Sequence, residues 1–194
     1  MSNLTTKPIT KVLIDDIEYP INTIYRNCID TLLMLNDNEV YDYEKADILI
    51  ENMYYKPYPE NINEAVKQAI NYLTKYSRSH ESDKEHDKDE KPVCDLEFDA
   101  VMIRDAFRLL NVDLDVEDIT YPRFMSLMRL ISTTEAPYCR IIHLRTQSNK
   151  NKLTKEERAE IDRVWGWDII NMSKGEKKAE YSEAYLEFMD KLKG

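Results

Sequence analysis

The residue types best able to support chemistry in this sequence are carboxylates. They occur as pairs in the stretch VDLDVEDI, namely Asp113 with Asp115 and Glu117 with Asp118. Closely spaced carboxylates are the oxygen ligands that a hard divalent cation prefers. In a loop between helices, however, such side chains usually hydrogen-bond nearby backbone amides or stay in solvent. We therefore expect no metal site here. Because no nucleophile or base stands at a recognisable spacing, we also expect that the protein is not an enzyme.

Histidine offers the next candidates. His80 and His86 lie in SRSHESDKEHDKDEK, which contains no apolar residue. Such a stretch cannot offset its ordering entropy by burial, so we predict a mobile acidic linker over residues 79–92, without the fixed geometry of a ligand cage. His143 lies among the apolar residues of RIIHLRT. No partner residue marks it as a general base, so we expect a hydrogen-bonded structural histidine.

The cysteines also argue against a chemical site. Cys28, Cys94 and Cys139 are odd in number and far apart, which is typical of reduced, buried thiols in a reducing compartment. The motifs HExxH, CxxC and GxSxG are absent, and the chain has only three glycines, too few for a phosphate-cradling loop. We expect no cofactor.

Length and charge narrow the class of protein. The 194 residues suit one domain, and a net charge of −10 argues against unaided nucleic-acid binding, which needs clustered Lys and Arg. The sequence contains neither the apolar run of a signal peptide nor a stretch able to span a bilayer, so we expect a cytoplasmic protein that binds no membrane. The acidic excess lies in residues 1–132, and either orients protomers head to tail or simply solvates the surface.

The pattern of apolar residues predicts a mainly α fold, a small helical domain of about six to eight helices with a short N-terminal β-hairpin. The hairpin covers residues 11–21 and turns at Asp15-Asp16. The predicted helices cover residues 23–35, 43–55, 62–76, 96–110, 121–131, 136–146, 155–167 and 176–192. We expect four domain segments: 1–78, the linker 79–92, a second helical half 93–170, and a loosely attached C-terminal helix in 171–194.

Helical spacing also predicts which faces are buried. The predicted buried stripes of three helices are Ile24, Cys28, Leu32 and Leu35, then Ile62, Val66, Ile70 and Leu73, then Phe98, Val101, Met102, Ala106, Leu109 and Leu110.

Several residues should mark helix ends. Asp95 is expected to cap the helix that ends at Asn111. Thr120 should begin the helix that contains Pro122. The sequence Thr154-Lys155-Glu156-Glu157 is a capping box, and Gly166 should interrupt the helix that follows.

The order and spacing of these segments resemble a family of small phage proteins encoded beside the tail tube and tape-measure genes of siphophages and prophages of Gram-positive bacteria. The segments that carry the resemblance are IDDIEYPINTIYR, ADILIENMYYKPYPENINEAV, CDLEFDAVMIRDAFR, VDLDVEDITYPRFMSLM, RIIHLRTQ and LTKEERAEIDRVWGW, which together cover roughly residues 12–170. Members of that family are regarded as tail assembly chaperones.

The resemblance implies a non-enzymatic role in the bacterial host cytoplasm. The protein would bind the long helical tape-measure protein and, in addition, the tail tube protein, and would self-associate. Exposed aromatic and Met side chains could shelter the apolar stripe of a client helix. The candidate protein-binding residues are Phe124, Met125, Met128, Trp165 and Trp167. Each of them is more typical of a core position than of a binding groove.

Two other functions remain open. The first is an acidic accessory protein that mimics nucleic acid or binds a host protein, and the second is a structural component of the virion. An enzyme with a carboxylate metal site is a third alternative, which stabilisation by divalent cations would reveal.

Overall fold

The computed structural model describes residues 7–37, 39–77 and 92–172. Within these ranges the chain forms eight α-helices, one π-helix and one two-stranded antiparallel sheet. This confirms the mainly α fold with a short N-terminal hairpin. Apart from residue 92, the predicted linker 79–92 lies outside the described residues, as does the predicted helix 176–192. The predicted division of the chain into four segments, which depends on these two stretches, stays a prediction.

The elements follow one another in a simple order. The strands are β1 (Lys11–Ile14) and β2 (Ile17–Pro20). The helices are α1 (Tyr25–Asn36), α2 (Asp42–Met53), α3 (Ile62–Ser77), α4 (Ala100–Leu109), α5 (Tyr121–Ile131), α6 (Pro137–Asn149), α7 (Lys155–Glu160), the π-helix η1 (Ile161–Trp165) and α8 (Trp167–Asn171).

Contacts group the described residues into two compact units. Unit 1 contains the described residues up to Ser77 together with 104–139, and unit 2 contains 92–103 together with 140–172. The division falls within α4 and within α6, so each unit combines two parts of the sequence that are far apart.

The hairpin of unit 1 turns as predicted. Asp15 and Asp16 both have positive φ, 49° and 63°, which is the geometry of a two-residue turn matched to the twist of the strands. The strands pair from Lys11 with Pro20 to Ile14 with Ile17. Ile14 is buried, whereas Ile17 at the turn is 55% exposed.

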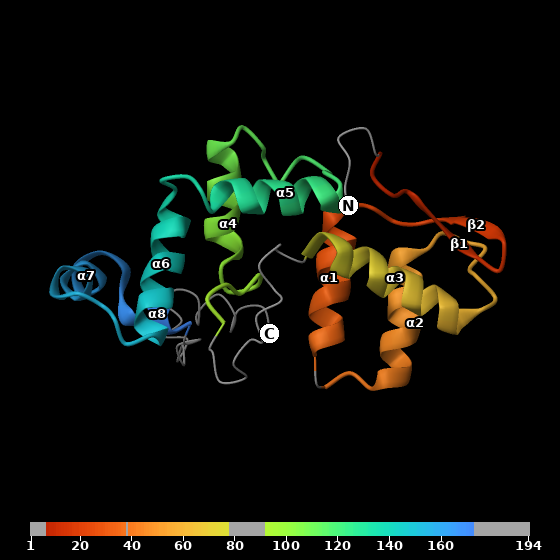
Figure 1. The fold of residues 1–194 in the computed structure, drawn as a ribbon, viewed down its shortest axis with the longest axis horizontal. Helices are drawn as coiled ribbons and strands as arrows, with labels where there is room; N and C mark the ends of the chain where they lie inside the picture. Colours follow the sequence, from red (N-terminus) through yellow and green to blue (C-terminus); the bar gives the residue numbers. More distant parts are fainter. Residues whose placement is uncertain (1–6, 38, 78–91, 173–194) are drawn as a thin grey trace, which may run out of the picture. The chain divides into compact units, whose positions relative to one another are not determined.

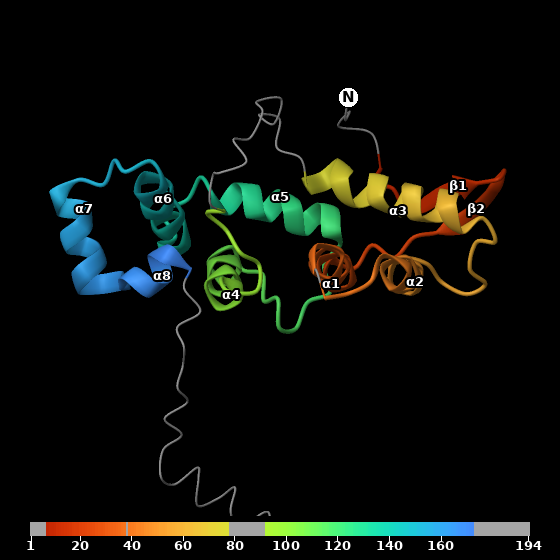
Figure 2. The ribbon, with the colours of Figure 1, turned by 90° about the horizontal axis from the view of Figure 1, so that it is seen from below.

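In unit 1, α1 and α2 lie side by side and α3 and α5 cross them (Figure 1). Figure 2 shows α1 and α2 nearly end-on, with α3 and α5 in a layer above them. The rings of Tyr25, Phe124 and Phe107 stack in series, with centroid separations of 5.0 and 5.1 Å. Aromatic stacking of this kind adds to the free energy of area burial.

The buried faces of three helices differ from the predicted stripes. In α3 the buried residues are Ala65, Ala69, Tyr72 and Leu73, while Ile62 and Ile70 are 42% and 39% exposed. In α1 the buried residues are Tyr25, Cys28 and Thr31, and in α4 they are Ile103, Ala106 and Phe107. The predicted Val101 and Leu109 are instead 64% and 65% exposed. The buried face of α3 therefore combines two small side chains with the large ring of Tyr72.

Unit 2 has its own small core. Ile141, Leu144, Ile161 and Ile170 are buried against one another, with Met102, Leu153, Trp165 and Ile169 packed around them. The core therefore joins α4, α6, η1 and α8 around four aliphatic side chains.

Candidate protein-binding surface

The segment of unit 2 that contains both tryptophans begins at the predicted capping box. Thr154 Oγ1 accepts a hydrogen bond from Glu157 N at 3.1 Å, and Glu157 accepts one from Thr154 N at 2.9 Å. This satisfies two amides that the first turn of α7 would otherwise leave unpaired. The backbone hydrogen bond from Thr154, followed by one from His143, lowers the pKa of Glu157.

The helix then widens into a π-helical turn. Gly166 N donates to Ile161 O at 2.8 Å, a bond that spans five residues and closes η1. Gly166 has φ of 83°, and a Cβ at this position would lie 2.6 Å from Asp168 Oδ1. Only glycine fits this turn without strain, so the predicted interruption at Gly166 is confirmed. Single π-turns of this kind are rare and often occur at functional sites.

We call residues 160–168 the tryptophan turn, because both tryptophans of the chain lie in it. Trp165 Nε1 donates to Glu160 at 3.0 Å, and Trp167 Nε1 donates to Asp162 at 2.7 Å. Each indole is thus held by a carboxylate five residues earlier in the chain. The two rings are fixed by hydrogen bonds as well as by packing.

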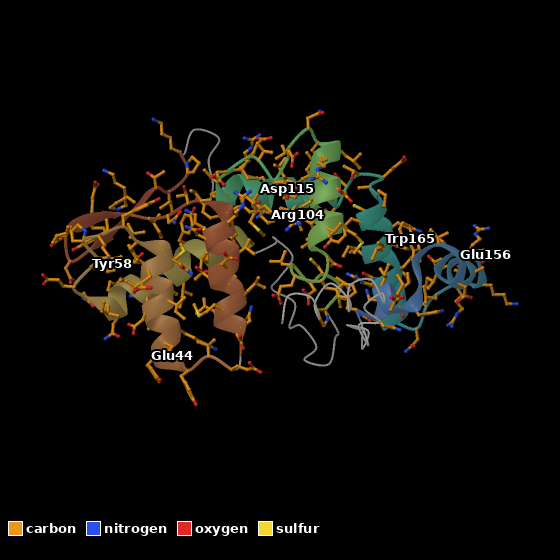
Figure 3. All side chains as sticks on the ribbon, turned by 180° about the vertical axis from the view of Figure 1, so that it is seen from behind. Glu44, Tyr58, Arg104, Asp115, Glu156 and Trp165 are labelled. Atoms are coloured by element: carbon orange, nitrogen blue, oxygen red, sulfur yellow. The ribbon has the colours of Figure 1, made fainter. Side chains whose placement is uncertain are left out.

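The tryptophan turn is fastened to α6 through Glu160. Arg140 Nε and Nη2 both donate to the Glu160 carboxylate, at distances between 2.5 and 3.2 Å. The hydrogen bonds from Arg140, and then that from Trp165, lower the pKa of Glu160 to about 2. Figure 3 shows Trp165 beside α6 and Glu156 on the outer side of α7.

A buried ion pair lies beneath this surface. Arg145 and Asp99 have side chains that are 1% and 0% exposed, and they form a bidentate pair at 2.7 and 2.8 Å. The remaining guanidinium N–H groups of Arg145 donate to the carbonyls of Val93 and Ile169. All five donors of the guanidinium are satisfied, which is the condition under which a buried charge is tolerated. The pair joins residues 93–99, α6 and α8.

The two tryptophans have different surroundings. Trp165 is half-buried and packs on the unit 2 core, whereas Trp167 is 36% exposed and Val164, three residues earlier in the chain, is 55% exposed. Trp165 therefore anchors the turn, and Val164 and Trp167 offer apolar surface to solvent. The charged side chains of Asp162, Arg163 and Asp168 are exposed around them. Val164 and Trp167 are thus exposed apolar positions within an otherwise charged stretch of the chain.

The other predicted contact residues lie in α5 of unit 1. Phe124 is 3% exposed and stacked between Tyr25 and Phe107. Its ring is therefore part of the core of unit 1 and is not available to a partner. Met125 and Met128 are half-buried on the same helix.

The paired carboxylates of the 112–119 loop hydrogen-bond backbone amides, as predicted, and in addition form ion pairs. Asp113 accepts a hydrogen bond from Asp115 N at 3.0 Å, and Glu117 accepts one from Asp113 N at 3.1 Å. Arg104 Nε lies 3.4 Å from Asp115 Oδ1. Figure 3 labels both residues. Within residues 7–37, 39–77 and 92–172, no group of three or more His, Cys, Asp or Glu side chains is arranged to hold a metal ion.

The single histidine and the cysteines in the described ranges have simple roles. His143 Nε2 lies 3.0 Å from Glu157 Oε1, as expected of a hydrogen-bonded histidine, although its side chain is largely exposed. The expectation of buried thiols is confirmed for Cys28, where burial raises the pKa to about 12, but is wrong for the exposed Cys94. Cys94 follows Val93, at the edge of unit 2, and does not reach its core.

Sequence reasoning missed Arg140, which fastens the tryptophan turn through Glu160, and the buried pair of Asp99 and Arg145, which joins residues 93–99, α6 and α8. A signal was present in α6: Arg145 follows Ile141 by four residues, so a cation falls on the buried face of an otherwise apolar stripe. A charge at such a position requires a buried partner.

The described residues form a small, mainly helical protein with a short N-terminal hairpin. Residues 5–165 match the profile of a protein family described as Bacteriophage Gp15 protein. The chain belongs to this family, and it is therefore a bacteriophage protein. The family suggests a structural or assembly-related role. No curated protein and no solved structure matches the chain significantly. None of the described helices has the length and apolar character needed to cross a membrane.

Proposed function

We propose that this protein is a non-enzymatic tail assembly chaperone that binds the tape-measure protein of its phage and assists growth of the tail tube around it. Membership of the bacteriophage Gp15 family supports a role in phage structure or assembly. The observation that carries the finer proposal is the tryptophan turn, where Val164 and Trp167 are exposed on a frame held by hydrogen bonds.

The proposed contact follows from the geometry of this turn. A client helix would lay its apolar stripe across Val164 and Trp167, while its polar flanks meet Asp162, Arg163 and Asp168. Trp is among the residues that contribute most to binding energy, because a large rigid ring is buried at little cost in conformational entropy. Two exposed apolar side chains form a small patch, which suits a contact that must release its client when the tail is assembled.

We further propose that the protein acts in the cytoplasm of the bacterial host, self-associates, and also contacts the tail tube protein. Size-exclusion chromatography with light scattering measures self-association. A mass that stays at that of one chain at all concentrations would contradict it.

Co-expression with the tape-measure protein of the same phage tests the function. We expect the soluble fraction of the tape-measure protein to rise and the two proteins to purify together. In a second arm, the variant Val164→Ser/Trp167→Ala should lose this effect. Val116→Ser, which alters a residue of unit 1 that is 80% exposed, is the matched control and should keep it.

Two outcomes would count against the proposal. Equal solubility of the tape-measure protein with and without this chain would exclude a chaperone role. Stoichiometric recovery of this chain in purified virions would favour a structural virion component instead.

A further inference from the structure

A second surface of unusual composition lies in unit 1, at the turn between α1 and α2. Tyr41 and Tyr43 are 67% and 69% exposed, and their rings stack on one another with centroids 5.8 Å apart. Tyrosine rings contribute to interfaces far more often than their share of the surface predicts. Two adjacent rings that remain in solvent therefore require an explanation that the fold of unit 1 does not supply.

Glu44 fixes the backbone of Tyr41 at the start of α2 and lies close to the Tyr43 hydroxyl. The backbone N–H of Tyr41 donates to Glu44 Oε2 at 3.2 Å, and the Tyr43 hydroxyl lies 3.5 Å from Glu44 Oε1. Figure 3 shows Glu44 at the end of the α1–α2 pair, and it lies in the first turn of α2. A fixed aromatic surface binds with a smaller loss of entropy than a mobile one.

The charge around the tyrosine pair is strongly negative. Residues 37–51 contain six acidic residues and one basic residue, Lys45. Lys45 Nζ donates to Leu35 O at 3.0 Å, so this cation is occupied by the carbonyl end of α1. Tyr43 and the exposed Asp47 are four residues apart in α2 and share one face.

The exposed tyrosine rings and the carboxylates near them together favour a positively charged partner. The face of an aromatic ring attracts Arg and Lys, and neighbouring carboxylates add ion pairs. Nucleic acid and anionic lipid carry the same charge sign as the surface and are repelled. We propose that Tyr41, Tyr43 and the surrounding carboxylates form a docking surface for a Lys/Arg-bearing segment of a partner polypeptide. The inference rests on unit 1 alone and does not depend on the proposed chaperone function.

Binding of hexa-arginine to the full chain at about 0.1 M salt tests the inference, with titration followed by amide chemical shifts in NMR. We expect the largest shifts within residues 37–51. The variant Tyr41→Ala/Tyr43→Ala keeps every charge and should weaken binding by about fivefold to thirtyfold, through the loss of two cation–π contacts. Tyr55→Ala removes a ring that is 51% exposed elsewhere in unit 1, and is the matched control.

A second variant separates the rings from the carboxylates. Glu39→Gln/Asp47→Asn keeps both rings and should weaken binding while reducing its dependence on salt, because fewer ion pairs form. Circular dichroism of each variant verifies the fold. Two results would overturn the inference: equal affinity of the tyrosine variant and the wild type, or shifts spread evenly over acidic residues outside 37–51. Either would show that the peptide adsorbs through net charge alone.

Discussion

The ion pair between Arg145 and Asp99 shows how much a single residue contributes to unit 2. Five hydrogen bonds from one guanidinium reach residues 93–99 and α8, and neither side chain is more than 1% exposed. The two residues are 46 positions apart, so no local pattern could predict their pairing. What the sequence did reveal was only a cation on an apolar helix face.

We predict that Arg145→Met destabilises unit 2 by about 3–5 kcal/mol, because Asp99 is left buried without its counter-ion. Both tryptophans of the chain lie in unit 2, so tryptophan fluorescence during urea unfolding reports on this unit. Adding Asp99→Asn should recover a substantial part of the lost stability, since the uncompensated charge is removed. Arg158→Met, at an exposed position, is the control. Equal stability of Arg145→Met and the wild type would contradict this account.

Replacement of tyrosine by phenylalanine should have opposite effects on stability at two buried positions. Among the described residues, the Tyr72 hydroxyl is buried without a hydrogen-bond partner, whereas the Tyr54 hydroxyl donates to Ala65 O at 2.7 Å. Burial raises the pKa of both phenols. Tyr72→Phe should stabilise unit 1 by about 1 kcal/mol, and Tyr54→Phe should destabilise it by about the same amount. Urea unfolding followed by circular dichroism measures both. A loss of stability in Tyr72→Phe would show that its hydroxyl is satisfied.

The lowered pKa of Glu160 predicts how the stability of unit 2 changes at acidic pH. Its pKa in the folded protein is about 2, below the value of about 4.3 expected in an unfolded chain. The folded state therefore binds fewer protons in this range, so the contribution of Glu160 to stability is complete above about pH 4.3 and is lost as the pH falls towards 2. Glu160→Gln should abolish this part of the pH dependence, as measured by tryptophan fluorescence in urea at a series of pH values. If stability depended on pH in the same way in the variant and the wild type, this role of Glu160 would be ruled out.

At the level of secondary structure, several features set by neighbouring residues were predicted, whereas features set by packing were not. The predicted cap at Asp95 was wrong for α4: its carboxylate accepts hydrogen bonds from Glu97 N and Phe98 N in the preceding turn, and α4 begins at Ala100. The Asp15-Asp16 turn, the Thr154 capping box and the breaks at Asn111 and Gly166 depend only on local backbone chemistry. The buried face of α3 depends on which helices it meets, and there Ala69 is buried while Ile70 is exposed. The π-helix was also missed, because its extra residue per turn leaves no mark on apolar spacing.

Substitution of Gly166 tests whether the tryptophan turn requires glycine at this position. Gly166→Ala places a Cβ close to Asp168 and forces a side chain into a backbone conformation with φ of 83°. We predict a destabilisation of about 1–3 kcal/mol together with a change in the emission of the neighbouring tryptophans. Ala159→Gly, at an exposed position of α7, is a control that should cost about 1 kcal/mol or less without altering the emission. Unchanged stability and emission in Gly166→Ala would mean that the turn tolerates other geometries.

For the whole molecule, composition and segment order were more informative than any single motif. The family expected from the resemblance over roughly residues 12–170 agrees with the match of residues 5–165 at the level of a phage protein. Of the predicted contact residues, Trp167 is the most exposed, while Phe124 belongs to the core of unit 1. Both are large apolar residues in helices, and only the three-dimensional fold separates an anchor from a contact. The binding partner itself stays a prediction.

The most direct measurement of the central claim is the affinity of the purified protein for its client. The fluorescence of Trp167, monitored while segments of the tape-measure protein are titrated, gives a dissociation constant. We predict saturable binding that Val164→Ser/Trp167→Ala, followed by calorimetry, weakens at least tenfold, equivalent to about 1.4 kcal/mol, while Val116→Ser leaves it unchanged. Binding of equal strength by all three proteins, or no binding by any of them, would contradict the account.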